Sequence, residues 1–151
     1  MATVLHQVGG STSLGASATN FFACNGGGAA SPSTTELFRK TIWREGGTLS
    51  NLYINIITND RAASTLRTRK AAANANLVVS ITGSTTGKFE DTSNTDTVTA
   101  GDDWHYSIVT GAGGTTFTFF VMQVLFAATT NTVQRLGTSV AAAFTSASST
   151  I

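Results

Sequence analysis

Charged side chains are scarce in this sequence. They make up 11% of its 151 residues, less than half of the roughly 25% typical of soluble domains. Nine Lys and Arg residues balance eight Asp and Glu residues, which leaves a net charge of +1. A chain with so little charge creates no long-range field that would attract nucleic acid or an anionic membrane. We therefore predict partners that are recognised by short-range contacts, and neither nucleic acid nor a membrane among them.

Cysteines and long apolar runs are also few. Cys24 is the only cysteine, which excludes an intramolecular disulfide and a cysteine-based metal site. No stretch reaches the roughly 20 apolar residues of a transmembrane helix. Residues 1–10 lack the basic start and the apolar centre of a secretory signal. The expected protein is synthesised in the cytoplasm and used without export.

The sequence lacks the motifs of common catalytic sites as well. It contains no G-x-S-x-G elbow, no H-E-x-x-H and no glycine loop followed by Lys-Ser or Lys-Thr. His6 and His105 are the only histidines, and His105 lies in a strand-like pattern beside Trp104. That setting favours a packed or surface imidazole over a member of a catalytic triad. We expect a protein that is not an enzyme and has no cofactor.

What the sequence does contain is the two-residue periodicity of β-strands. Trp104, Tyr106 and Ile108, for example, alternate with the residues between them. Clusters of Gly, Asn and Asp separate such runs, as is typical of sandwiches and jelly rolls. We predict an all-β jelly roll or β-sandwich of about eight to ten antiparallel strands, with extended N- and C-terminal arms. Strands are expected at residues 19–24, 36–44, 52–57, 64–70, 76–82, 95–100, 104–109 and 115–126.

The two ends of the chain are almost free of charge. Sixteen of the seventeen charged residues lie at positions 36–103, and Arg135 is the exception. The chain is accordingly divided into an N-terminal arm with a candidate first strand (1–34), a jelly-roll core (35–127) and a C-terminal arm (128–151). Ordering an arm costs about 1–2 kcal/mol per residue. Side chains of Ser, Thr and Ala recover this only by packing, so we expect contacts with neighbouring subunits.

The longest apolar stretch, residues 116–126 (TFTFFVMQVLF), is apolar on both faces of a strand. Strict alternation places Phe117, Phe119, Val121 and Leu125 on one face and Phe120, Met122, Val124 and Phe126 on the other. The outer face then needs a cover, either a neighbouring subunit or one of the chain's own arms. The residues expected at interfaces are Phe21, Phe22, Leu125, Phe126, Val133, Leu136, Val140 and Phe144.

Charged residues suggest two further sites. Arg67 and Arg69 share one face of a strand and are expected to form inter-subunit ion pairs with Asp102, Asp103 or Glu90. Carboxylate oxygens are also the ligands that Ca²⁺ prefers, which makes Asp91, Asp96, Asp102 and Asp103 weak candidates for a calcium site. Their spacing matches no known calcium loop, and the alternative is that Asp91 and Asp102 bond the backbone of nearby turns.

Residues 47–114 resemble a module that is frequent in tailed-phage and metagenomic virus proteins. The matching segments are GTLSNLYI at 47–54, TLRTRKAAANANLVVSI at 65–81, GKFEDTSNTDTVTAGD at 87–102 and VTGAGG at 109–114. The resemblance implies a jelly roll similar to tumour-necrosis-factor-like trimer domains, as used in capsid decoration, head fibres or tail-fibre tips. The sequence has Ala71-Ala72-Ala73-Asn74 where the module has an Asn-Gly turn, which favours a longer loop there.

The expected function is that of a virion structural protein. The leading hypothesis is a capsid decoration or cement protein of a tailed phage, a homotrimer that binds a major capsid protein or another virion protein. One alternative is a receptor- or glycan-binding module of a fibre, with exposed aromatic rings near Trp43, Tyr53 or Trp104. Another is the subunit of a self-assembling filament or shell. Deletion of residues 127–151 is expected to leave the core folded and to abolish binding to particles.

Overall fold

The structure, a computed structural model, describes residues 3–10, 13–24 and 32–130. This part of the chain contains nine β-strands and one short 3-10 helix. In chain order they are β1 (Thr3–Gly9), β2 (Thr19–Ala23), η1 (Glu36–Arg39), β3 (Thr41–Ile42), β4 (Gly47–Asn59), β5 (Ser64–Lys70), β6 (Ala73–Ile81), β7 (Gly87–Val98), β8 (Asp103–Val109) and β9 (Phe117–Ala128).

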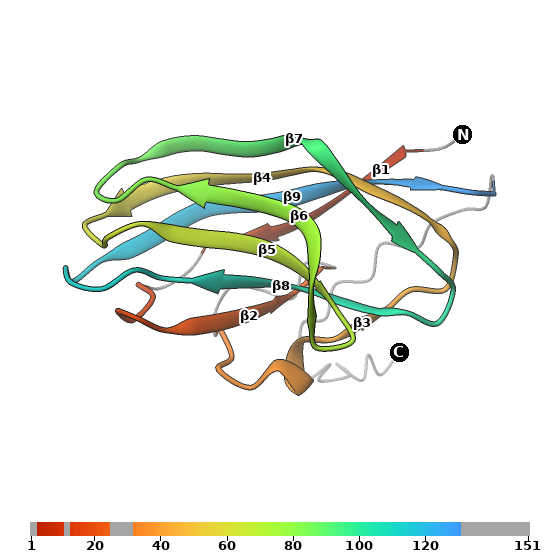
Figure 1. The fold of residues 1–151 in the computed structure, drawn as a ribbon, viewed down its shortest axis with the longest axis horizontal. Coiled ribbons are helices and arrows are strands. Elements are labelled where there is room, and N and C mark those ends of the chain that lie inside the picture. The colour runs from red at the N-terminus through yellow and green to blue at the C-terminus, as the bar shows by residue number, and fades with distance from the viewer. Residues whose placement is uncertain (1–2, 11–12, 25–31, 131–151) are drawn as a thin grey trace, which may run out of the picture.

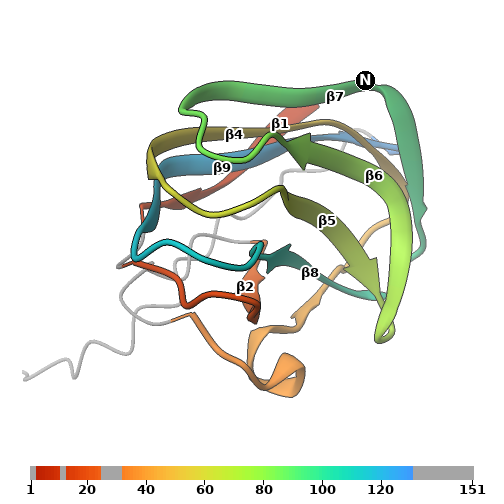
Figure 2. The ribbon, with the colours of Figure 1, turned by 60° about the vertical axis from the view of Figure 1, so that its left-hand side comes forward.

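The strands form two antiparallel sheets that lie face to face (Figures 1 and 2). Sheet A has the order β1-β9-β4-β7. Sheet B has the order β2-β8-β5-β6, and β3 also pairs with β8. Successive strands change sheet at every step except β2 to β3 and β5 to β6, which is the arrangement of a jelly roll. The prediction of an all-β sandwich is confirmed.

The core fills the space between the sheets and follows from the period of two. On β8, Trp104, Tyr106 and Ile108 are buried against side chains of β4 and β9 in one hydrophobic cluster, as their alternation predicts. Burial of each such side chain contributes roughly 1.5–3 kcal/mol. The core therefore fixes which face of each strand points outward.

The first two strands lie within the segment that the sequence assigns to an N-terminal arm. β1 pairs with β9 from Thr3↔Ala127 to Gly9↔Val121, and β2 pairs with β8 along its whole length. Val8 and Phe22 are buried in the core. Both strands are integral parts of the sandwich.

The end of sheet A likewise extends beyond the expected core boundary. Ala128 is buried and pairs with Gly47 of β4. A deletion that starts at residue 127 would therefore remove the end of β9, so the C-terminal arm is better tested by truncation after Thr130. Residues 131–151 lie outside the described part of the chain.

The prediction of one strand over residues 36–44 is wrong. Glu36–Arg39 form the 3-10 helix η1, in which the Phe38 amide donates to the Thr35 carbonyl, and only Thr41–Ile42 are a strand. The Glu36 side chain is bound by two residues of sheet B, and these bonds draw the chain into a turn. Residues 32–42, which cross the outer side of sheet B, are called the strap below.

The expectation of a long loop between β5 and β6 is also wrong. Lys70 pairs with Ala73, so only Ala71 and Ala72 form the turn. Both have positive φ, 47° and 66°, as a type I′ turn requires. The Asp103 carboxylate accepts the Ala71 N–H at 2.6 Å, and the Arg69 guanidinium donates to the Ala72 carbonyl. These two contacts hold alanines in a conformation that usually needs Asn-Gly.

Candidate functional site

The outward side of sheet A is the most distinctive surface of the molecule, and it is called the outer face below. The three strands β1, β9 and β4 contain no Asp, Glu, Lys or Arg. Among the described residues, charges appear on this face only on the edge strand β7, at Lys88 and Glu90. Pairing aligns outward side chains into rows, which are Gln7–Gln123–Tyr53 and Leu5–Leu125–Ser50.

A β-bulge in β9 adds an aromatic ring to this face. Asn55 pairs with Val121 and Ile56 pairs with Phe119, so Phe120 has no partner on β4. Such an extra residue shifts the alternation by one position. Phe120 is consequently 64% exposed and lies near Ile57, which is 55% exposed.

The bulge also corrects the assignment of faces in β9. Alternation holds up to Phe119 and is then displaced, so Met122, Val124 and Phe126 point into the core together with Phe117 and Phe119. Val121 and Leu125 are half-buried on the outward side. The outer face nevertheless carries exposed apolar groups, because the bulge exposes Phe120, and these lie among uncharged polar side chains such as Gln7 and Gln123.

Beside Phe120 the outer face contains an open depression of about 530 Å³. A side chain at Gly9 would meet no atom within 4 Å, whereas one at Gly10 would collide with the Phe119 carbonyl. The absence of side chains at these two glycines keeps the depression open. Its lining contains no charged residue and consists of Gln7, Gly9, Gly10, Ile57, Phe119, Phe120, Val121 and Gln123.

The interface residues expected from the sequence fall into four groups. Phe22 and Phe126 are 3% and 0% exposed in the chain's own core, so their assignment to an interface is wrong. Phe21 is 8% exposed, on the other sheet. Leu125 is half-buried on the outer face. Val133, Leu136, Val140 and Phe144 lie outside the described residues.

Of the residues expected to form inter-subunit ion pairs, Arg69, Asp102 and Asp103 pair with other residues of the same chain. Asp102 pairs with Lys70 and Asp103 with Lys40, each at 2.6 Å, and Arg69 pairs with Glu36 at 2.7 Å. Arg67 does lie on the same strand face as Arg69, but it forms no ion pair with any described residue.

The calcium candidates Asp91 and Asp96 bind protein donors. Asp96 accepts from the amides of Asn76 and Leu77 and from the Thr68 hydroxyl. Asp91 accepts from the Val78, Ser93 and Asn94 amides. Burial raises the pKa of Asp91, but these bonds outweigh it, so the pKa lies below its usual value. The Ser93 contact is the Asx-turn expected as the alternative to a calcium site.

The other two candidates are separated from these. Asp102 closes its own turn by accepting the Thr99 amide at 2.7 Å, as expected, and Asp103 binds Ala71 and Lys40. Within residues 3–10, 13–24 and 32–130, no three His, Cys, Asp or Glu side chains are grouped as metal ligands would be.

The tryptophans are not available as sugar platforms. Trp43 is 6% exposed and Trp104 is 1% exposed. Trp43 packs against both His6 and Phe126 with tilted rings, whose centroids are 4.6 Å and 4.4 Å away. On sheet A the ring of Phe120 is exposed, although strict alternation placed Phe120 on the same face as Phe126.

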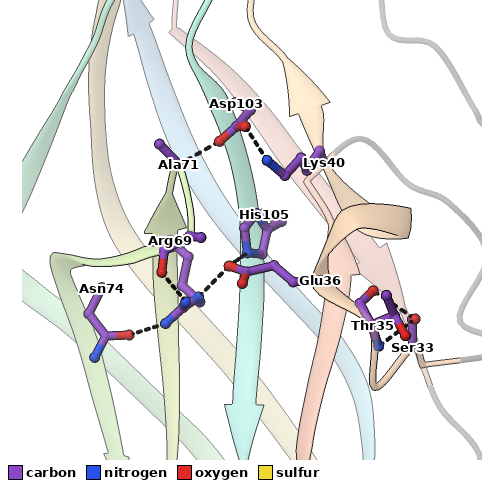
Figure 3. A network of polar contacts seen from close by, with 10 residues as sticks. Ser33, Thr35, Glu36, Lys40, Arg69, Ala71, Asn74, Asp103 and His105 are labelled. Carbon is purple, nitrogen blue, oxygen red and sulfur yellow. Dashed lines mark hydrogen bonds and ion pairs between the residues drawn. The ribbon is translucent and has the colours of Figure 1, made fainter.

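A polar cluster on the other sheet was missed in the sequence. Glu36 of η1 points toward Arg69 of β5 and His105 of β8 (Figure 3). The bond from Arg69, and then that from His105, lowers the pKa of the Glu36 carboxyl in spite of its burial. Burial in turn lowers the pKa of His105, against the effect of Glu36. Because Glu36 is 33 and 69 residues distant from its partners, no local signal indicates this cluster.

Comparison with known proteins leaves the chain without a family. Neither a protein-family model nor a curated protein matches its sequence. In the described part of the chain no helix has the length and apolar character needed to cross a membrane. The arguments for function therefore come from the surfaces described above.

Proposed function

We propose that this chain is a structural protein of a virus particle, a capsid decoration protein that forms a homotrimer through the outer face of sheet A and binds shell proteins elsewhere on its surface. The observation that carries this proposal is the absence of charge from β1, β9 and β4 together with the exposure of Phe120 and Ile57. The resemblance of residues 47–114 to virion jelly rolls agrees with it.

The physical reason is the cost of leaving such a surface in water. Interface cores are depleted of charge and enriched in aromatic residues relative to the remaining surface. The outer face has this composition, with Leu5 (40% exposed) at one end and Phe120 at the other. Its flanking charges, Lys88 and Glu90, lie on the edge strand, where a polar rim is expected.

A trimer that binds only assembled shells would stabilise them by mass action. Apolar association of this kind depends little on ionic strength, in contrast to assembly through exposed ion pairs. We therefore expect the trimer to persist in 1 M salt. The ion pairs of Asp102 and Asp103 are satisfied within the chain and are not required for it.

The test compares two exposed phenylalanines. Phe120→Ser removes the ring from the outer face, and Phe38→Ser removes a ring of similar exposure, 70%, from the strap. Sedimentation equilibrium should show a trimer for the original chain and for Phe38→Ser. For Phe120→Ser we expect about 10- to 30-fold weaker association, as for an interface hot spot. A monomeric original chain, or equal effects of both changes, would contradict the proposal.

Binding to the shell is tested separately. Truncation after Thr130 retains every described strand. We expect the truncated chain to stay folded and trimeric and to lose binding to purified capsids, as seen by co-sedimentation. Retained binding would show that the arm is not needed for decoration.

One observation favours a second candidate, a glycan-binding module of a fibre. The depression combines the Phe120 ring with the amide groups of Gln7 and Gln123, and sugars are bound by such pairs of apolar and hydrogen-bonding groups. Titration with host polysaccharide distinguishes the two functions. Binding that Phe120→Ser abolishes, by a chain that does not attach to capsids, would support the fibre module.

A further inference from the structure

The strap hides a histidine on the outward side of sheet B. His105 points away from the core, yet its side chain is 0% exposed. The Phe21 ring lies edge-on to it at 5.6 Å, and η1 places Glu36 against it (Figure 3). Phe21 in turn exchanges two backbone hydrogen bonds with Ser33, at 2.8 Å and 3.2 Å. The strap is therefore the cover of this part of the sheet.

The Glu36 carboxylate fixes the protonation of the hidden ring. Its Oε1 accepts from Arg69 Nε at 2.7 Å and lies 2.6 Å from His105 Nε2. An ionised carboxylate only accepts hydrogen bonds, so the neutral imidazole carries its proton on Nε2. The other nitrogen, Nδ1, is buried and has no hydrogen-bond partner among the described residues. A second proton would create a buried N–H without an acceptor there.

The strap is attached unequally at its two ends. Thr41–Ile42 pair with β8 as strand β3, and Lys40 is bound to Asp103 at 2.6 Å. Toward the N-terminal end, the attachments among the described residues are the bridge between Phe21 and Ser33 and the Glu36 contacts. The helix η1 between them has no buried residue. Lifting the strap from its N-terminal end would thus break few apolar contacts.

We propose that the strap is an acid-released cover: protonation of His105 places a buried charge and an unpaired Nδ1–H under the strap, and the segment from Ser33 to Arg39 lifts off sheet B. The charged groups that face His105 are Glu36 from η1, Arg69 from β5 and Asp103 from its own strand. β2 contributes the uncharged ring of Phe21. Glu36 favours the imidazolium, but burial disfavours it more strongly, and the Arg69 charge opposes it as well. Release exposes Phe21 and the covered side of β8.

The sign of the effect follows from linkage. In the lifted state His105 is solvated and titrates near its ordinary pKa of about 6.5. Under the strap its pKa is lower, because burial disfavours the charged ring. Each pH unit below about 6.5 therefore shifts the equilibrium up to about tenfold toward release, until the covered ring also titrates. Protonation of Glu36 also favours release, but only at pH values below its ordinary pKa of 4.5.

Hydrogen exchange of the Phe21 and Ser33 amides measures the release directly. Between pH 7.5 and 5.0, after correction for intrinsic rates, their protection should fall by up to about tenfold per pH unit below 6.5. The Leu14 amide, which donates to the Phe117 carbonyl away from the strap, reports global opening and should change much less. Equal changes at all three amides, or none, would overturn the proposal.

Two variants separate the histidine from the strap. His105→Gln keeps a donor for Glu36 but does not titrate in this range, so protection should become independent of pH between 7.5 and 5.0. Glu36→Gln removes a charge that favours the imidazolium under the strap, so protection of Phe21 and Ser33 should be lower at every pH while its slope below pH 6.5 remains. A slope that persists in His105→Gln, or one that disappears in Glu36→Gln, would exclude His105 as the acid-sensitive group.

Discussion

The two-residue turn between β5 and β6 leads to a prediction that can be worked through from the backbone. Ala71 and Ala72 have φ of 47° and 66°. In this left-handed region the Cβ of an L-residue approaches the following carbonyl, which costs about 1–2 kcal/mol per residue. Glycine has no such cost, and Asn tolerates the region better than alanine does. The change Ala71→Asn with Ala72→Gly should therefore stabilise the fold.

The expected gain is smaller than the sum of these costs. Glycine increases the conformational freedom of the unfolded chain, which offsets about 0.4–1 kcal/mol. The backbone bond from the Ala71 N–H to Asp103 is kept in the variant. We expect a net gain of about 1–1.5 kcal/mol for the double change. In a domain of this size 1 kcal/mol corresponds to about 2–4 °C in Tm, so Tm should rise by about 2–6 °C.

The assay is thermal unfolding followed by circular dichroism, confirmed by urea titration. Ala73→Gly is the matched control, because Ala73 is the next residue, is equally exposed and has no positive φ. It should destabilise by about 0.5–1 kcal/mol, as glycine does within a strand. If Ala72→Gly lowered Tm as much as Ala73→Gly, the assignment of strain to this turn would be refuted.

Two further predictions concern stability. Arg61, 4% exposed, donates to the carbonyls of Leu14, Gly113, Gly114 and Thr115. A hydrogen bond from a charged donor contributes about 1.5–3 kcal/mol, and water can replace part of the four bonds, so Arg61→Met should destabilise the fold by about 3 kcal/mol. A loss of stability below about 1 kcal/mol in urea titration would disprove that Arg61 joins these loops. Carboxyl groups whose pKa is lowered in the fold stabilise it at pH values above their unfolded pKa, which is 3.8 for Asp and 4.5 for Glu. This stabilisation is lost as the pH falls below those pKa values. The urea midpoint should therefore decline steadily below pH 4.5, and a constant midpoint down to pH 3 would contradict the contribution of Glu36, Asp91, Asp102 and Asp103.

Periodicity was sufficient to predict the sandwich and much of its core. Trp104, Tyr106 and Ile108 point inward as their alternation indicates, because one face of a strand must be buried. The apolar character of a residue indicates that it is covered, but it does not show whether the chain's own core or a neighbouring subunit covers it. Phe22 and Phe126 were assigned to an interface for this reason, although they pack within the chain's own core.

The remaining features depend on contacts between distant residues. The bulge at Phe120 arises from the register of β9 against β4, which no property of β9 alone defines. The turn at Ala71 is held by Asp103, 32 residues away, and Asp103 meets Lys40 across 63 residues. Sequence patterns within one element describe its faces, but they contain no information on such pairings. The two apolar sides of β9 indicated from the sequence that its outward side needs a cover, but no sequence pattern indicated the depression.

The two proposals place their residues on opposite sheets, and this leads to a last prediction. Phe120, Ile57 and the depression belong to sheet A, while Glu36, Arg69 and His105 connect the strap to sheet B. The residues that contact one set are different from those that contact the other. Changes at independent sites have additive effects. Phe120→Ser should therefore weaken association without altering the pH dependence of Ser33 exchange, and His105→Gln should remove that dependence without altering association. If the trimer of the original chain dissociated near pH 5.5 and that of His105→Gln did not, the strap would be coupled to the outer face, and the separation of the two surfaces would be wrong.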